Sequence, residues 1–384
     1  MNPREKSSLL ISVNIIIFLT IIFMNGITAQ DAPEQIPATN IKDVLNYPRT
    51  ENSMPGKFPG KVVQVNHSNC IAENKIIYQS AYDMLAKGML ELTGAETLKD
   101  AWLMFVNEND RIGLKVNPVA GPTLSTSVEV TQAIVNQLEE AGIPRDHLII
   151  WDRRETQLYE AGFDDKNFPG IKIIGTERSG ENGTMYDENG KLYSLQMIDT
   201  TWYYWADCEE KYDEETIQWM VNEGKYSYFT KIVTQMVDKI INVPILKNAG
   251  PTVTLCLKNL AYGSISNTAR LHQKLWSETC AEVCAFPPLR DKVVLNIVDG
   301  IKGCFNGGPG ANPQFFINYN TMLIGTDPVA VDKIGYDIVT QKRIEENLQK
   351  EPSKRGAMFL ELAQNLNLGT ADPQKIEHLK FNLE

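Results

Sequence analysis

The arrangement of residues 111–152 constrains the fold of this chain more than any other stretch. The segment RIGLKVN, residues 111–117, is typical of a β-strand, and Pro118 ends it. Apolar residues then recur at helical spacing until Gly142. HLIIWD, residues 147–152, is a short apolar strand. A strand, a helix and a buried strand in succession form a βαβ unit, so we predict a parallel sheet with a right-handed crossover.

The start of the helix in this unit can be predicted from its capping residues. Thr126 and Glu129 have the spacing of a capping box, so we expect the helix to begin near Thr126. Before the unit, residues 61–66 form a β-type run and residues 76–92 have helical spacing. After it, residues 171–175 predict a further strand.

The second half of the chain repeats the alternation. IINVPIL (240–246), TVTLCL (252–257) and KVVLNIVD (292–299) are predicted strands, the last of the buried parallel type. Asp327 and Pro328 then start a helix, with the aspartate as N-cap and the proline at the first helical position. The predicted fold class is α/β, a mainly parallel sheet flanked by helices.

An acidic, aromatic-rich insertion interrupts this fold. Residues 177–223 hold 12 Asp or Glu against 3 Lys or Arg, and three of the six tryptophans. Such aromatic density favours an ordered segment, either a lid over a site or a decorated subdomain. The predicted organisation is an N-terminal segment, a linker, a first α/β half, the insertion, and a second α/β half with a helical tail, over residues 1–29, 30–60, 61–176, 177–224 and 225–384.

The first 29 residues resemble a secretory signal peptide. Arg4 and Lys6 precede the apolar run 9–24, and Ala29 is a small residue suited to the cleavage point. The alternative is an uncleaved anchor, but a run of 16 residues containing Asn14 is shorter than the roughly 20 that span a bilayer. We expect an exported protein, periplasmic or extracellular, that contacts a membrane only through this segment if it is uncleaved.

Charge and cysteine spacing exclude two classes of function. A formal net charge of -11 without a basic run argues against nucleic-acid binding. The six cysteines include no C-x-x-C pair, so zinc ribbons and iron–sulfur clusters are not indicated. In an oxidising compartment the cysteines are expected to form disulfides, with 15 possible full pairings, or to be buried free thiols.

Polar side chains gather where the predicted strands end. In a parallel α/β sheet, ligands bind outside the carboxyl ends of the strands. Three lysines at such ends in an acidic chain predict a shared site for a carboxylate or phosphate, although most lysines taken singly are solvated loop residues. The residues placed at this anion site are Lys115, Asn117, Lys247, Lys258 and Asn259.

Further residues are candidates for proton transfer or metal binding. Asp299 follows an apolar strand and, with Lys258 and His272, is a candidate catalytic residue, although a lone helical histidine is more often structural. Asp152, Asp299 and Asp332 are candidate ligands of a divalent cation.

The stretch DGIKGCFNGGPG, residues 299–310, matches neither a P-loop nor a dinucleotide-binding motif. We interpret it as a loop leaving a buried strand, whose glycines let the backbone approach a ligand closely. Gly307, Gly308 and Gly310 are therefore added to the predicted ligand-binding residues.

These motifs together resemble the bacterial domain of unknown function 362 family. The matching pieces are GLKVN (113–117), DKIINVPILKN (238–248), LKNLAYG (257–263) with His272 downstream, NIVDGI with the GGPG loop (296–310), GTDPVAVD (325–332) and the tail pattern 360–377. They occur in the family's order. The resemblance implies no assigned reaction, but many members carry or neighbour ferredoxin-like iron–sulfur motifs. The chain departs from the family there, because it has no such motif of its own.

Three functions follow as hypotheses. The leading one is an exported protein, either an enzyme or a binding protein, that binds a small anionic ligand through the strand-end lysines; its cofactor is unknown. The second is a thiol, redox or metal-associated protein that uses Cys280, Cys284 and Cys304 with a redox partner protein. The third is a non-enzymatic surface-binding module built on the acidic insertion.

Overall fold

A ten-stranded mixed sheet organises residues 38–384, which form one unit of the computed structural model. The structure describes residues 36–180, 183–210, 224–351, 353 and 355–384. The predicted signal peptide and residues 211–223 of the predicted insertion lie outside the described residues. Within the described ranges, no helix is long and apolar enough to cross a membrane.

The strand order of the sheet is β14-β1-β13-β12-β9-β4-β5-β6, with β10 beside β12 and β11 beside β10. Neighbours run parallel from β12 through β9, β4 and β5 to β6, whereas β13 is antiparallel to both of its neighbours. The prediction of an α/β fold with a mainly parallel sheet is confirmed. The strands of this sheet are β1 (Lys61–His67), β4 (Ile112–Val116), β5 (Leu148–Arg154), β6 (Lys172–Glu177), β9 (Lys239–Val243), β10 (Ile245–Ala249), β11 (Thr252–Thr254), β12 (Val293–Cys304), β13 (Phe316–Gly325) and β14 (Glu377–Leu383).

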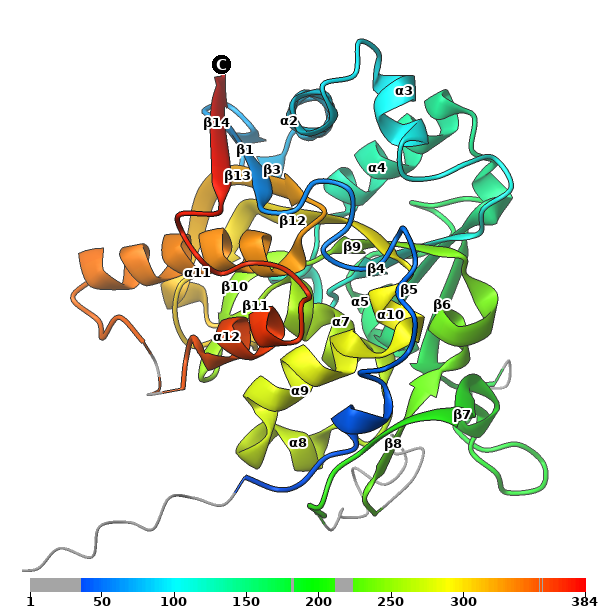
Figure 1. Cartoon of the computed structure of the whole chain (residues 1–384). Helices are drawn as coiled ribbons and strands as arrows, with labels where there is room; N and C mark the ends of the chain where they lie inside the picture. Colours follow the sequence, from blue (N-terminus) through cyan, green and yellow to red (C-terminus); the bar gives the residue numbers. More distant parts are fainter. Residues whose placement is uncertain (1–35, 181–182, 211–223, 352, 354) are drawn as a thin grey trace, which may run out of the picture. The chain divides into compact units, whose positions relative to one another are not determined.

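Helices cover the two faces of this sheet, and each face has its own hydrophobic core (Figure 1). One core holds the helices α2, α3, α4 and α5, and the other holds α7, α9, α11 and α12. Alternation along the strands explains the division, because successive side chains point to opposite faces. The helices are α2 (Tyr78–Thr93), α3 (Leu98–Leu103), α4 (Val128–Ala141), α5 (Glu155–Glu160), α7 (Cys256–Ser264), α8 (Ala269–Lys274), α9 (Trp276–Glu282), α10 (Pro287–Arg290), α11 (Pro328–Glu345) and α12 (Met358–Asn365).

The alternation decides where Lys115 points. In β4, Ile112, Leu114 and Val116 belong to the core under α2 and α4. Gly113 and Lys115 therefore face the opposite side, toward α7. A lysine in the middle of this parallel sheet is fully buried, so its ammonium requires partners from other segments.

Two predicted strands differ from the structure. IINVPIL is split by Pro244 into β9 and β10, and Lys247 lies within β10 instead of after a strand. The strand predicted over 252–257 stops at Thr254, and α7 begins at Cys256. The helix begins there because the Asp332 carboxylate of α11 accepts hydrogen bonds from the backbone N–H groups of Cys256 and Leu257, at 2.6 and 3.0 Å.

The observed strand β12 is longer than the strand predicted over residues 292–299. β12 continues through Asp299 to Cys304, so the start of the glycine-rich stretch is strand and not loop. Its glycines fit between close neighbours: a Cβ at Gly303 would lie 2.2 Å from the carbonyl oxygen of Leu246, and one at Gly300 would lie 2.8 Å from Thr321. Glycine here reports close strand packing and not a turn.

Helix starts were predicted with mixed success. The N-cap of α4 is Ser127, one residue after the predicted Thr126, whose hydroxyl instead donates to the carbonyl oxygen of Val243 at 2.6 Å. Asp327 caps α11 as predicted, accepting from the N–H groups of Val329 and Ala330. Burial raises the pKa of Asp327 to about 6, even though backbone N–H groups favour its charged form.

In the predicted insertion, β7 (Ile198–Trp205) pairs antiparallel with β8 (Tyr226–Thr230), which lies just after it in the predicted second α/β half. A second small sheet pairs β2 (Ile71–Ala72) with β3 (Lys75–Ile76). Residues 38–60 of the predicted linker are anchored at several points, with Val44 and Met54 buried in the core that contains α7, although residues 45–51 are exposed. The Pro- and Asn-rich composition of this segment therefore describes an irregular backbone and not a loose one.

Candidate functional site

A small cavity lies where β4 and β5 end, on the side of the sheet covered by α7. We call it the lysine cavity; its volume is about 140 Å³. The cavity is lined by residues that follow β4 and by residues of the last part of β5. α7 and α8 close the other sides, and Pro309 of the GGPG loop reaches its edge. Its main polar lining is Asn117, Asp152, Arg153, Lys258, Tyr262 and His272.

The floor of the lysine cavity is a buried ion pair. The Lys115 ammonium contacts the Asp152 carboxylate and donates to the side-chain oxygen of Asn259 at 2.9 Å and the carbonyl oxygen of Val116 at 2.8 Å. Burial lowers the pKa of Lys115, and the Asp152 charge opposes this change. A Cβ at Gly263 would lie 2.2 Å from Lys115, so this glycine lets α7 pack directly on the pair.

Three asparagines extend the network beside this pair. Asn259 Nδ2 donates to Asn242 Oδ1 at 2.8 Å and to the carbonyl oxygen of Lys115 at 3.2 Å. Asn259 Oδ1 accepts from Lys115 and from Asn117 Nδ2, the latter at 3.0 Å. Asn117 Oδ1 is buried and has no hydrogen-bond partner among the residues that the structure describes. An unpaired buried acceptor beside a cavity needs an explanation, because such groups are costly.

Lys258 lies on α7 and lines the cavity. The amine lies 5.8 Å from the centroid of the Tyr262 ring, and in the described residues it makes no hydrogen bond or ion pair. Burial lowers the pKa of Lys258 from its ordinary value of 10.5. A partly buried amine beside which the described residues place an aromatic face, and no counter-charge, can accept an anion as its partner.

His272 lies on α8 at the mouth of the cavity, next to the Tyr262 ring, with the two ring centroids 4.4 Å apart. His272 as a whole is exposed, but desolvation on the side of its ring that faces the cavity, with the nearby charges of Lys258 and Arg153, lowers its pKa below the ordinary 6.5. The imidazole is therefore neutral at physiological pH.

Lys247 does not line the lysine cavity. It is fully buried, and its amine donates to the carbonyl oxygens of Val119 and Leu124 at 2.7 and 3.1 Å. Burial and the nearby Lys258 charge lower the pKa of Lys247 to about 7. Its contacts hold the loop that follows β4, so Lys247 supports one wall of the cavity from behind.

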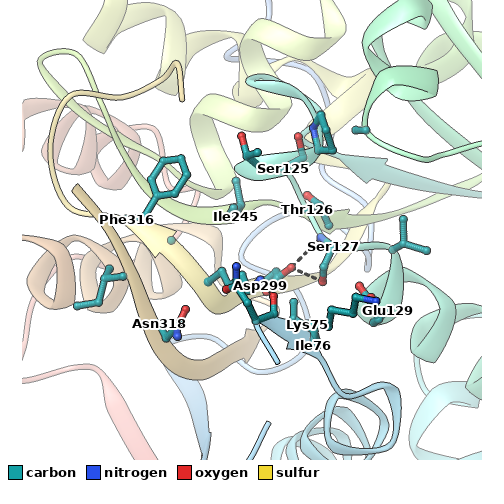
Figure 2. A pocket seen from close by; sticks show the side chains of 18 residues that line it. Lys75, Ile76, Ser125, Thr126, Ser127, Glu129, Ile245, Asp299, Phe316 and Asn318 are labelled. Carbon is teal, nitrogen blue, oxygen red and sulfur yellow. Dashed lines mark hydrogen bonds between the residues drawn. The ribbon is translucent and has the colours of Figure 1, made fainter. Parts of the chain in front are cut away.

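Asp299 lines a second, larger cavity of about 500 Å³ (Figure 2). We call it the Asp299 cavity; its lining includes Ser125, Ser127, Glu129, Ile245, Asp299 and Phe316. Asp299 accepts hydrogen bonds from the Ser127 N–H and hydroxyl groups at 2.8 and 2.6 Å, and from the Ile301 N–H at 3.1 Å. Burial raises the pKa of Asp299. These bonds attach the start of α4 to β12.

Comparison with known proteins identifies the family. The family model described as a domain of unknown function, DUF362, matches residues 112–337, which is more than half of the chain. The chain belongs to the DUF362 family. The matched region includes Lys115, Lys258 and Asp299. The resemblance inferred from the motifs is confirmed.

Other comparisons give less. No curated protein matches the chain. A crystal structure of a Thermotoga maritima protein from a structural genomics consortium is similar over 71% of this chain and 60% of that chain, with 6% sequence identity and a TM-score of 0.35. The matched part thus spans about three fifths of that protein.

Most of the predicted catalytic, binding and metal-ligating side chains lie at one of the two cavities. Lys115, Asn117, Asp152, Lys258, Asn259 and His272 meet at the lysine cavity, and Asp299 lies at the other. Asp332 is fully buried under α7, and burial raises its pKa to about 7. In the described ranges, no group of three or more potential ligands from His, Cys, Asp and Glu forms a metal site. Asp152 is paired with Lys115, Asp299 with Ser127, and Asp332 with backbone N–H groups.

The glycines of the GGPG loop hold the loop in place. The Gly308 N–H donates to Asn248 Oδ1 at 3.2 Å, its carbonyl accepts from Gly250, and a Cβ at Gly308 would collide with the Asn248 carbonyl. Gly307 has a φ of 69°, and a Cβ at Gly310 would meet nothing within 4 Å. Of the four residues of the loop, Pro309 lines the lysine cavity.

The six cysteines are all free. Cys280 and Cys284 are fully buried, and burial raises the pKa of both thiols well above the ordinary value. The Cys304 thiol donates to the carbonyl oxygen of Asn306 at 2.7 Å. Buried, protonated thiols are inert packing groups and give the thiol hypothesis no support.

Several residues that line the lysine cavity were not predicted as site residues, and Arg153 and Tyr262 are the two whose side chains bear most on its chemistry. Arg153 directly follows Asp152 in β5, so the strand-end rule that selected Asp152 also covers it. Tyr262 belongs to LKNLAYG, which lay beyond a predicted strand and is in fact helix α7. Helical spacing would have found Tyr262, because it is four residues after Lys258 and shares its face.

Proposed function

We propose that this chain is an exported protein that binds a small anionic molecule in the lysine cavity, with the Lys258 amine as the principal partner. The observation that carries the proposal is the Lys258 amine itself, which lines a cavity and has no hydrogen-bond or ion-pair partner in the described residues. Export rests on the signal-peptide pattern of residues 1–29.

The charges around the cavity support an anionic ligand. Lys115 and Asp152 neutralise one another at the floor. Arg153 lies 3.4 Å from the Glu177 carboxylate, which Arg154 also contacts at 2.9 Å. Among the described residues, Lys258 has no counter-charge in contact with it, so an anion that enters gains an attraction that no described carboxylate already provides.

The position of the cavity is a second line of support. Ligands of parallel α/β folds bind outside the carboxyl ends of the strands, which is where Asn117 and Asp152 stand. Should chemistry follow binding, Lys258 would stabilise developing negative charge and the neutral His272 would accept a proton. Binding is the part of this function that the geometry supports most directly.

Ligand-dependent melting tests the proposal. Acetate and phosphate, added at constant ionic strength with chloride as the reference, distinguish a carboxylate from a phosphate site. An anion at 100 times its Kd is expected to add about 2.7 kcal/mol to the free energy of unfolding. Lys258→Met keeps the volume of the side chain and removes its charge, so the affinity should fall about tenfold or more.

The matched control is Lys302→Met, because Lys302 lines the Asp299 cavity. This variant should respond to the anion as the wild type does. Equal stabilisation of wild type and Lys258→Met, or none in the wild type by either anion, would overturn the proposal.

A further inference from the structure

The lysine cavity presents hydrogen-bond acceptors as well as a cation. Asn259 Nδ2 donates to two oxygens, which fixes the orientation of its amide. Asn117 must then direct its own Nδ2 to Asn259 Oδ1, and its Oδ1 is left without a donor in the described part of the chain. The hydrogen bonds of Asn259 therefore explain why Asn117 Oδ1 has no donor among the described residues.

His272 supplies a second acceptor. Its Nδ1 lies 2.9 Å from the carbonyl oxygen of Thr268, and because a carbonyl only accepts, Nδ1 carries the proton. In a neutral imidazole the other nitrogen, Nε2, is then an acceptor. The ring lines the cavity beside Tyr262, so this acceptor belongs to the same site as Lys258.

We infer that the anion bound in the lysine cavity carries a hydroxyl group, and that the class of ligand is a small hydroxycarboxylate. This inference rests on the proposed function. The carboxylate pairs with the Lys258 amine, and the hydroxyl donates to Asn117 Oδ1 or His272 Nε2. A hydroxyl fits better than an ammonium as the donor, because Lys258 and Arg153 repel a second cation in this cavity.

The size of the cavity narrows the class. Sites for drug-sized molecules occupy roughly 300–1,000 Å³. The lysine cavity, at about 140 Å³, is less than half of the lower figure. It therefore favours a short-chain acid over a sugar phosphate or a nucleotide.

Paired ligands that differ by one hydroxyl test the inference. Glycolate is compared with acetate, and 3-hydroxypropionate with propionate, by calorimetry or melting on the full protein at constant ionic strength. We expect at least one hydroxy acid to bind about fivefold or more tightly than its partner. Glycine, whose donor is an ammonium, should bind more weakly than glycolate.

The outcomes separate this inference from the proposed function. If acetate and propionate bind and their hydroxy acids bind no better, the hydroxyl is overturned and the anion site stands. If no acid of either pair binds, both fail. If glycine binds as tightly as glycolate, the choice of hydroxyl over ammonium is overturned.

Variants then connect the preference to its acceptors. His272→Phe keeps the ring packing on Tyr262 and removes Nε2, and Asn117→Leu removes Oδ1. At least one should retain acetate affinity within about twofold while losing the preference for glycolate. His378→Phe is the control, because His378 has a similarly lowered pKa of about 4 and its Nε2 hydrogen bonds to Gln64 in β1. If both site variants keep the full preference, the assignment is wrong.

Discussion

The lysine cavity and the Asp299 cavity differ in whether their polar groups already have partners in the described protein. The Asp299 cavity is the larger, at about 500 Å³ against about 140 Å³. Its central carboxylate, that of Asp299, accepts hydrogen bonds from Ser127 and from the Ile301 N–H group. In the lysine cavity, Lys258 and Asn117 Oδ1 have no hydrogen-bond partner in the described residues.

This difference teaches that volume alone does not indicate a binding site here. Groups that satisfy each other contribute to the fold, whereas groups that have no partner are available to a ligand. Asp299 was predicted as a catalytic residue, but its carboxylate already has hydrogen-bond donors from the protein, so we assign it to the fold. Lys115 belongs with them too, because its amine is bound to Asp152 and Asn259.

The largest expected effect is at the floor of the lysine cavity. Lys115→Met leaves the buried Asp152 charge unpaired, so the free energy of unfolding should fall by about 3–5 kcal/mol. Urea denaturation measures this change. Arg111→Met breaks the exposed Arg111–Asp238 pair and should cost less than about 1 kcal/mol. Similar losses in both variants would contradict a structural role for Lys115.

Asp299→Ala should have the next largest effect. It removes the acceptor that holds Ser127 at the start of α4, and the free energy of unfolding should fall by about 1–3 kcal/mol. The stabilisation by a bound anion should not change, since Asp299 does not line the lysine cavity. Loss of anion binding in this variant would show that the two cavities act together.

Lys258→Met is expected to stabilise the protein in the absence of ligand. In the wild type the partly buried Lys258 amine has no partner in the described part of the chain, and a methionine of similar length removes the cost of burying it. The gain should be on the order of 1 kcal/mol at neutral pH by urea denaturation. A variant that is less stable than the wild type would mean that Lys258 is a structural residue.

The smallest expected effects are two opposite pH dependences. The pKa of Lys258 is lowered from 10.5, so the unfolded state binds more protons below that pH and the contribution of Lys258 to stability is lost as pH falls. The pKa of Asp299 is raised from 3.8, so the folded state binds more protons and its contribution is lost as pH rises.

Variants reveal these two dependences as differences from the wild type. The advantage of Lys258→Met should shrink as pH approaches 10, whereas Asp299→Asn should improve relative to the wild type as pH rises from 4 to 6. Unfolding curves at several pH values provide the measurement. Slopes of the same sign for both variants would remove the contrast between the cavities.

The sequence predicted the framework of the site because strand and helix signals are local. The βαβ pattern placed Lys115, Asn117 and Asp152 together, and the structure brings these residues to one cavity. Lys258 was predicted at the same site for a partly wrong reason, since it stands on α7 and not after a strand. The start of α7 depends on Asp332, 76 residues after Cys256, and no local pattern reveals that contact.

The glycine-rich stretch, residues 299–310, is a second place where local sequence patterns do not reveal a contact with distant residues. Gly300 and Gly303 suggested a loop, but they lie in strand β12. They are glycines because Thr321 and Leu246 of neighbouring strands approach too closely for a side chain at these positions. A glycine that turns the chain and a glycine that admits a neighbour are identical in sequence.

The sequence by itself determined the α/β class, the family and the segment in which each site residue lies, because these depend on periodicity, turn residues and the order of motifs. Only the tertiary structure decided which polar groups have partners. Lys115 finds Asp152, and Ser127 finds Asp299 from 172 residues away. The candidate site is defined by Lys258 and Asn117. The fold brings both residues to one cavity, and no described residue forms a hydrogen bond or ion pair with the Lys258 amine or with Asn117 Oδ1.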